Sequence, residues 1–156
     1  MKLVLTAAGE VDLQMVNGRL AQETALYTAV IVSLLTDRRA LPDDRLPDDP
    51  QPVTLLPPDR RGWCGDALAE TAGERIGSRL WLLQREKQTE ETRRRAIDYC
   101  KEALQWMIDD GHAVSVAVAA EWADTYSGRL NVHIEIVLPD GTTYSLDLPI
   151  GGFHAV

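Results

Sequence analysis

The C-terminal third of the chain constrains the fold most, because one helical pattern is followed there by three alternating ones. In residues 89–110, apolar side chains recur at the spacing of one helix face. Residues 113–122, 129–138 and 142–150 alternate apolar and polar side chains, as half-buried strands do. The connections ADTYSG and PDG are typical of hairpins. We therefore predict an α+β fold in which helices pack on an antiparallel β meander over residues 113–150.

The remainder of the chain reads as shorter elements around this unit. Residues 1–20 contain turn signals between short apolar runs and predict a small extended arm. Residues 22–36 predict a helix that is apolar on more than one side, and residues 78–86 a short helix. Residues 40–58 hold six of the eight prolines, which predicts a long proline-rich loop, either solvent-exposed or ordered on a partner. The 156 residues fit a single domain spanning 1–156.

Composition argues against several classes of protein. The net charge of −8 disfavours binding to nucleic acid, which requires a basic surface. No run of eighteen apolar residues is present, so we expect no membrane span, and the N-terminus lacks the apolar stretch of a secretory signal. Cys64 and Cys100 have no metal-binding spacing, and we expect both to be free thiols in a reducing cytoplasm.

No catalytic constellation emerges from the sequence. His112, His133 and His154 lie apart, and HIE is not the helical HExxH pattern of zinc enzymes. No histidine pairs with a cysteine in the pattern of an activated nucleophile, and the many glutamates lack the context that separates a general acid from its ionised partner. We expect no catalytic residue, no metal and no cofactor.

Arginine and tryptophan gather in the middle of the chain. The word DRR occurs at 37–39 and again at 59–61. Arginine and tryptophan are residue types that anchor protein interfaces. The candidate interface residues of this region are Arg38, Arg39, Arg60, Arg61, Trp63, Arg79, Trp81 and Arg85. Two alternatives remain open: the arginines pair with aspartates inside the fold while both tryptophans fill the core, or some of these residues serve catalysis.

The order of the motifs resembles a known family. SLLTDRRA, DRRGWCGD, GSRLWLLQREKQTEET, ALQWMIDDG and a β meander with PDG follow one another over residues 10–150. This order is similar to that of the small baseplate wedge subunit of Mu-like contractile-tail phages, a branch of the wider wedge family of phage tails and contractile injection systems. Members of the wider family often carry a lysozyme label, so a cell-wall glycosidase is the rival function. A cytosolic binding module unrelated to tails is a third possibility.

The resemblance implies a structural role in the virion, for a protein made in the host cytoplasm. Such subunits form the inner wedge ring around the tail tube, commonly in six copies. Their implied partners are larger baseplate wedge proteins, the tail sheath subunit, and baseplate hub or tail tube proteins, with neither nucleic acid nor membrane among them. They serve as the platform for the first sheath ring. The wider family's Glu-Pro-Arg motif is absent after the long helix, where residues 108–112 read IDDGH, so contacts of that motif do not transfer.

The last strand also reads as an assembly site. Residues 142–148 contain neither lysine nor proline, the residues that usually protect a sheet edge. We expect this strand to accept a strand of another chain, with Tyr144, Leu146 and Leu148 as apolar anchors and Leu146→Pro as a variant that disrupts the edge. The alternatives are that the strand is central, or that the tail GGFHAV covers its edge.

Overall fold

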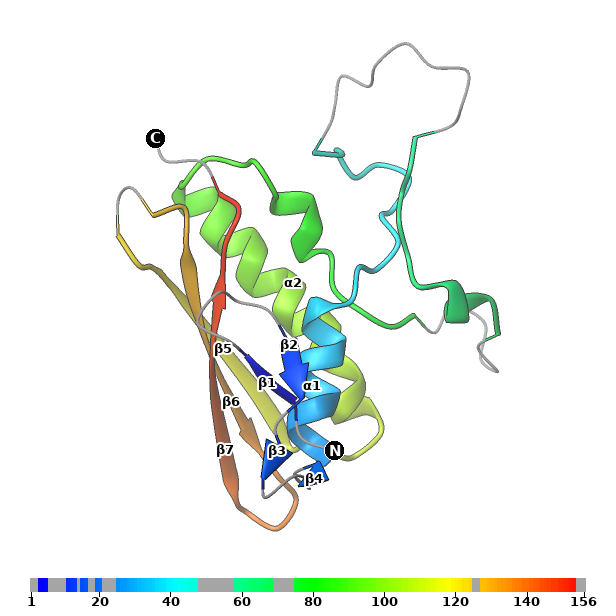
Figure 1. Ribbon diagram of the computed structural model, residues 1–156, viewed down its shortest axis with the longest axis vertical. Coiled ribbons are helices and arrows are strands. Elements are labelled where there is room, and N and C mark those ends of the chain that lie inside the picture. The colour runs from blue at the N-terminus through cyan, green and yellow to red at the C-terminus, as the bar shows by residue number, and fades with distance from the viewer. Residues whose placement is uncertain are drawn as a thin grey trace.

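The structure is a computed structural model. It describes residues 3–5, 11–13, 15–16, 19–20, 25–47, 58–68, 75–124 and 127–153. Two α-helices lie against a three-stranded antiparallel sheet, which confirms the predicted α+β class (Figure 1). Two small hairpins precede the first helix.

The sheet consists of β5 (Ser115–Trp122), β6 (Leu130–Val137) and β7 (Thr143–Ile150) in the order β5-β6-β7. All three predicted strands are therefore present, each slightly shorter than its alternating pattern. The alternation decides which face is buried, because successive side chains of a strand point to opposite sides. In β6 the even-numbered residues are buried and the odd-numbered residues from Asn131 to Glu135 are exposed.

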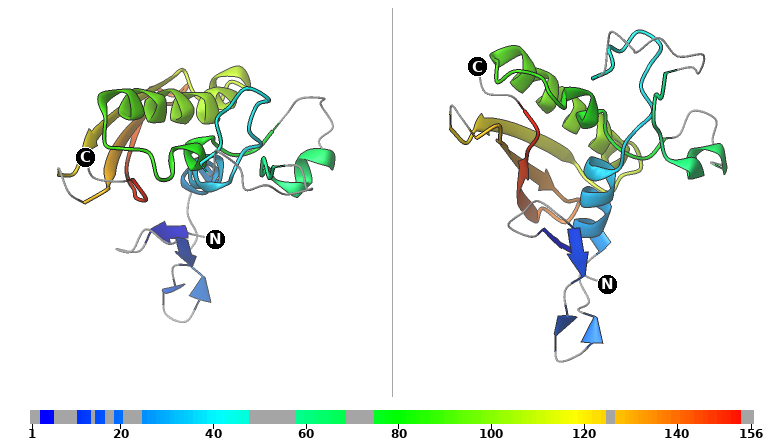
Figure 2. Two further views of the ribbon diagram at one scale, coloured as in Figure 1. Left: turned by 90° about the horizontal axis from the view of Figure 1, so that it is seen from above. Right: turned by 45° about the horizontal axis from the view of Figure 1, so that its top comes forward.

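Helix α2 (Glu90–Asp109) covers the apolar face of the sheet, as Figures 1 and 2 show. It begins where the sequence predicts, since the Thr89 hydroxyl accepts the Thr92 N–H at 3.1 Å. Glu90 lies in the first turn, where a negative charge is favourable. Hydrogen bonds from Arg93 and Arg94 lower the pKa of Glu90 to about 2. Gly111 follows the helix with a φ of 73°, the left-handed conformation typical of a helix end.

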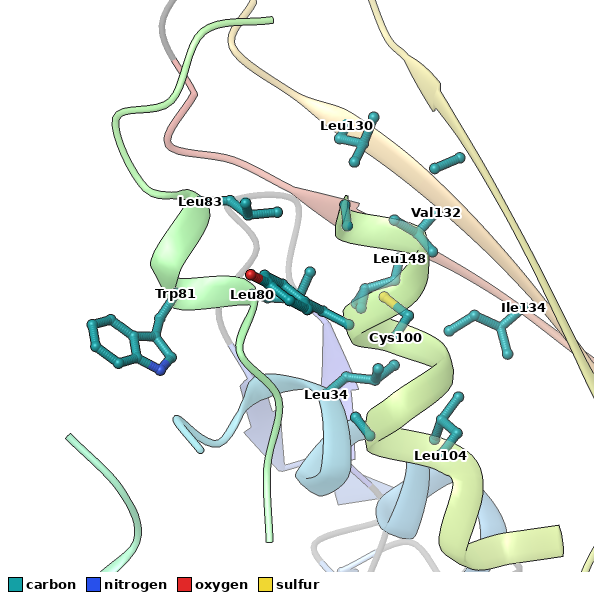
Figure 3. Packing of buried hydrophobic residues seen from close by; sticks show 14 of the residues in the cluster. Leu34, Leu80, Trp81, Leu83, Cys100, Leu104, Leu130, Val132, Ile134 and Leu148 are labelled. Carbon is teal, nitrogen blue, oxygen red and sulfur yellow. The ribbon is translucent and has the colours of Figure 1, made fainter. Parts of the chain in front are cut away.

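The core forms where α1 (Ala25–Leu35) and the short 3-10 helix η2 (Leu80–Leu83) meet α2 and the sheet (Figure 3). Side chains from all four parts are buried together, including Leu34, Leu82, Leu104, Ile134 and Leu148. Cys100 lies in this core, and burial raises the pKa of its thiol to about 12.

The helix predicted over 78–86 is wrong in length and type, because only the 3-10 turn Leu80–Leu83 forms. All four of its side chains are buried, so the segment has no solvent-facing side and lacks the period of a surface helix. Arg85 adopts a φ of 69° directly afterwards, which is incompatible with a continuing helix.

The N-terminal arm forms two hairpins. Strand β1 (Leu3–Leu5) pairs antiparallel with β2 (Val11–Leu13), and β3 (Met15–Val16) with β4 (Arg19–Leu20). Seen along α1 in the left view of Figure 2, both hairpins project to one side of this helix.

The proline-rich segment is described at its two ends only. Within residues 40–47, Ala40 and Leu46 are buried, whereas Leu41, Pro42, Asp43 and Arg45 are exposed. Asp44 forms an ion pair with Arg79 at 3.0 Å. Residues 48–57 lie outside the described residues, and the expected loop there remains a prediction.

The chain crosses the end of the sheet after β7. Phe153 N–H donates to the Gly128 carbonyl (3.2 Å), and its ring contacts Trp122 edge-on at 5.0 Å between centroids. The Gly152 carbonyl accepts the Arg85 N–H at 2.9 Å. Residues 151–153 therefore close the end of the sheet between the β5–β6 connection and the segment after η2. Residues 154–156 lie outside the described part.

Candidate assembly surfaces

Some of the predicted interface arginines are internal to the subunit. The Arg79 guanidinium donates to Glu102 Oε2 (2.9 and 2.8 Å) and to the Asp44 carboxylate (3.0 and 3.1 Å), and it lies 4.6 Å from the centre of the Tyr99 ring. Burial alone would lower the pKa of Arg79, but these two carboxylates raise it. The side chain of Arg79 is only 16% exposed. This arginine joins η2, α2 and residues 40–47 within the subunit.

Trp81 and two further arginines also hold the segment that follows α1. The Trp81 ring is buried, and its Nε1–H donates to the Arg38 carbonyl at 2.8 Å. The Arg38 guanidinium lies 3.6 Å from Glu102. The Arg60 guanidinium donates to the Leu41 carbonyl and to the Pro42 carbonyl (2.9 Å). Trp81 is therefore buried as in the internal alternative, whereas Arg38 lies near a glutamate and Arg60 donates to backbone carbonyls instead of aspartates.

Arg61 is held in a strained conformation. Its φ is 50°, a left-handed value that non-glycine residues rarely adopt. The Asp59 carboxylate accepts its N–H at 2.8 Å, and its guanidinium pairs with Asp37 at 2.7 Å and stacks 4.5 Å from the centre of the Trp81 ring. Strain of this kind persists only where surrounding contacts hold it. Arg61 is consequently anchored on one side and partly exposed on the other.

An exposed pocket opens beside Arg61. It has a volume of about 420 Å³, and Arg39, Trp63 and Arg75 line it together with Arg61 and Asp66. We call it the Arg–Trp pocket. Trp63 is 46% exposed. Arg75 carries no sequence signal that would have marked it as a site residue.

Two glycines explain why the motif DRRGWCGD builds this pocket. A Cβ on Gly62 would lie 2.9 Å from the Cβ of Arg39, and the φ of Gly62 is 111°, so a side chain there is both crowded and strained. A Cβ on Gly65 would lie 2.2 Å from the Trp63 ring. The indole of Trp63 therefore lies directly on the backbone of Gly65, and this contact holds it at the mouth of the pocket.

The backbone of β7 presents only alternate residues to solvent. In an antiparallel pair, facing residues alternate between hydrogen-bonded and non-hydrogen-bonded pairs. Leu138 N–H donates to the Thr142 carbonyl (2.8 Å), so the even-numbered residues of β7 direct their backbone groups towards β6. The N–H of Leu146 faces Ile134 in the neighbouring strand. The expectation that Leu146→Pro would remove an edge donor is therefore wrong, and Ser145 and Asp147 carry the outward groups.

The two edges of the sheet differ. On β5, the Ala120 carbonyl accepts Arg93 Nη1 at 3.0 Å, so a side chain of α2 occupies part of that edge. On β7, no described residue hydrogen-bonds to the outward backbone groups of Thr143, Ser145 or Asp147. In the part of the chain that the structure describes, β7 is therefore an open edge and not a central strand.

Side-chain burial changes the role of the predicted anchors on β7. Leu148 is 1% exposed and belongs to the core, while Tyr144 and Leu146 are half-buried against it. Past the C-terminal end of β7, a pocket of about 130 Å³ lies between Leu34, Trp81 and Phe153. Leu148 is thus already packed within the subunit, and only Tyr144 and Leu146 leave apolar surface that an added strand could cover.

A second groove lies between the two helices. It has a volume of about 320 Å³ and includes Val32 of α1, Trp106 of α2, and Ile76. All three side chains are at least 36% exposed. Arg75 lines both this groove and the Arg–Trp pocket, so the two hollows adjoin.

The described residues contain no cluster of side chains that could bind a metal ion. No group of three or more histidines, cysteines or acidic residues lies close enough there to hold a metal ion. His133 Nδ1 lies 2.7 Å from Asp147 Oδ1 on the exposed face of the sheet, and no third histidine, cysteine or acidic residue among those described joins this pair to form a metal site. Within the same part of the chain, no helix has the length and apolarity needed to cross a membrane.

Comparison with known proteins agrees with the resemblance read from the motifs. The chain is 44% identical over 120 residues to the "Baseplate protein gp46" of Escherichia phage Mu, covering 77% of this chain and 74% of that protein. It is 37% identical over 135 residues to the "Mu-like prophage FluMu protein gp46" of Haemophilus influenzae, covering 86% of this chain and 84% of that protein. The family described as "Phage protein GP46" matches residues 26–143. The chain therefore belongs to the family of phage protein GP46, the Mu-like family to which its motifs point.

Proposed function

We propose that this phage baseplate protein is a structural wedge subunit of the inner ring around the tail tube, a single domain over residues 1–156 present in six copies. Its role is to bind the larger wedge proteins and to act as the platform on which the first sheath ring assembles. The relative from phage Mu is named "Baseplate protein gp46", which supports the baseplate assignment. The open edge of β7 is the observation that carries the finer role.

Strand addition at β7 is the mechanism we propose for sheath binding. An exposed edge is a template for another strand, and backbone hydrogen bonds then supply affinity while side-chain pockets supply specificity. Thr143, Ser145 and Asp147 offer outward backbone groups in a row, and Pro149 ends the row of donors because proline has no N–H. In a contractile tail the added strand would come from the terminal arms of the sheath subunit, as the family resemblance implies.

The groove between α1 and α2 is our candidate contact for a larger wedge protein. Val32, Ile76 and Trp106 present apolar surface that nothing in the described part of the chain covers. Grooves of this type accept the apolar face of a partner helix. The occupant we propose is a helix of a larger wedge protein in the bundle that the resemblance implies.

The variant Ser145→Pro tests the sheath platform. It removes one outward N–H from β7 while leaving every bond to β6 in place. We expect the subunit to fold and to enter baseplates, and the resulting tails to carry little or no sheath. Electron microscopy of purified tails measures the sheath, and mass spectrometry confirms incorporation of the variant.

Ser145→Ala is the matched control, because it makes a similar change of side chain and keeps the N–H. Tails with Ser145→Ala should carry sheath of normal length. Normal sheath on tails that contain folded Ser145→Pro would rule out strand addition at this edge.

The rival glycosidase function lacks support from the described pockets. A glycosidase needs two carboxylates about 5–10 Å apart in one cleft. The pocket past β7, the Arg–Trp pocket and the groove between the helices are each lined by a single acidic residue among those described: Asp37, Asp66 and Asp110, respectively.

A further inference from the structure

The Arg–Trp pocket concentrates positive charge on an acidic protein. Three arginines, Arg39, Arg61 and Arg75, line it against one aspartate, Asp66, whereas the whole chain carries a net charge of −8. The Asp66 carboxylate already accepts the Ile76 N–H at 3.1 Å. The pocket therefore has a local charge opposite to that of the chain around it.

Among the described residues, two of the three arginines have no acidic partner. Arg61 pairs with Asp37, but neither Arg39 nor Arg75 forms an ion pair with a described residue. Within the described part of the chain, the Arg39 guanidinium donates a single hydrogen bond, a long contact of 3.5 Å to the Arg61 carbonyl. An arginine has five N–H donors in a planar fork suited to a carboxylate. Both side chains thus have donors available at the pocket.

The indole of Trp63 gives the pocket an apolar wall. The ring rests on Gly65 and remains 46% exposed. Tryptophan and arginine are the residue types enriched at the centres of protein interfaces. The strained backbone of Arg61 and the close approach of Gly62 to Arg39 hold these groups together.

We infer that the Arg–Trp pocket binds an acidic segment of a neighbouring tail protein, with its aspartate or glutamate side chains on Arg39 and Arg75 and an adjoining apolar side chain on Trp63. This inference rests on the proposed structural role, because the segment belongs to another component of the tail. Charge complementarity selects the partner: the pocket repels basic segments and offers carboxylates two guanidinium groups that form no ion pair with a described residue.

A binding assay on the full-length free subunit tests the inference. The probe is a fluorescein-labelled peptide of about ten residues, composed of aspartate, glutamate and leucine, and binding is followed by fluorescence anisotropy. The double variant Arg39→Gln/Arg75→Gln should weaken binding about tenfold, because it removes two charge-assisted contacts. Affinity should fall as salt is added, since the arginines are exposed.

Arg94→Gln is the matched control. Arg94 is an equally charged residue on α2, with a side chain 73% exposed, and it lies outside the pocket. It should leave the affinity within about twofold of the unmodified protein, because a single exposed charge contributes little. Trp63→Ala should weaken binding without changing its salt dependence, since the indole carries no charge.

The other occupants give distinct results. Equal or tighter binding of a single-stranded DNA oligonucleotide through Arg39 and Arg75 would overturn an acidic peptide in favour of nucleic acid. Peptide binding that occurs only after Glu70→Gln/Glu74→Gln would show that the chain's own glutamates compete for the pocket, which would also overturn the inference. So would self-association that the double variant abolishes, or an affinity unchanged by that variant. The assay uses no tails, so its failure leaves the test of the sheath platform unaffected.

Discussion

At the scale of single residues, the arginines of this chain divide into internal and external groups. Arg79 lies within a network of two carboxylates and one aromatic ring, whereas Arg39 and Arg75 face a pocket. Residue type alone does not separate them. What separates them is whether a carboxylate from a distant part of the chain reaches the guanidinium.

The internal role of Arg79 leads to a prediction about stability. Arg79→Met leaves Glu102 and Asp44 without their common partner, and we expect it to lower the free energy of unfolding by about 2 kcal/mol. Arg79→Lys keeps the charge but loses the fork, so it should cost less than Arg79→Met. Urea denaturation measures both. The control Arg94→Gln, at a mostly exposed ion pair, should lower the free energy of unfolding by less than about 0.5 kcal/mol. If Arg79→Met lowered it by no more than Arg94→Gln does, the stabilising role of the Arg79 network would be contradicted.

The sequence predicted the candidate surface residues only in part. Arginine and tryptophan pointed to the segment DRRGWCGD, which lines the Arg–Trp pocket. The pairing of Arg79 with Glu102 and Asp44, in contrast, joins residues 23 and 35 positions apart. No local pattern reports such a pairing. Arg75 was missed for the same reason, because its place in the pocket depends on how residues 61–67 fold back beside it.

At the scale of elements, local patterns predicted the meander and α2 because each of these has one buried and one exposed face. Alternation in β6 and the stripe along α2 follow directly from that arrangement. The patterns failed for η2, whose consecutive residues Leu80–Leu83 are all buried. A segment enclosed on every side has no polar period, so its length and type depend on tertiary packing.

The start of α2 supports a second stability prediction. The Thr89 hydroxyl accepts the Thr92 N–H, which would otherwise be unpaired in the first turn. Thr89→Ala should therefore lower the free energy of unfolding by about 1 kcal/mol. Thr89→Asp can still accept this bond and adds a favourable charge at the helix N-terminus, so its stability should stay within about 0.5 kcal/mol of the unmodified chain. Thermal or urea unfolding distinguishes the two, and equal losses would mean that the cap is unimportant.

At the scale of the whole molecule, the edge of β7 and the Arg–Trp pocket lie on different sides. The sheet with β7 occupies one side of α2, and the segment with Trp63 and η1 (Cys64–Leu68) occupies the other (Figures 1 and 2). The core of α1, η2 and α2 lies between them. A subunit built in this way can hold two partners at once without their contacts overlapping.

This separation predicts that the two surfaces act independently. Substitutions at distant sites with no shared contacts have additive effects, so Ser145→Pro should leave the affinity for the acidic peptide within about twofold. In turn, Arg39→Gln/Arg75→Gln should leave all backbone groups of β7 available. Tails whose baseplates contain this double variant should therefore carry sheath of normal length. Anisotropy on the free subunits and electron microscopy of tails measure the two effects. Peptide binding weakened by Ser145→Pro in a folded subunit would show that the surfaces are coupled through the core between them, contrary to this expectation.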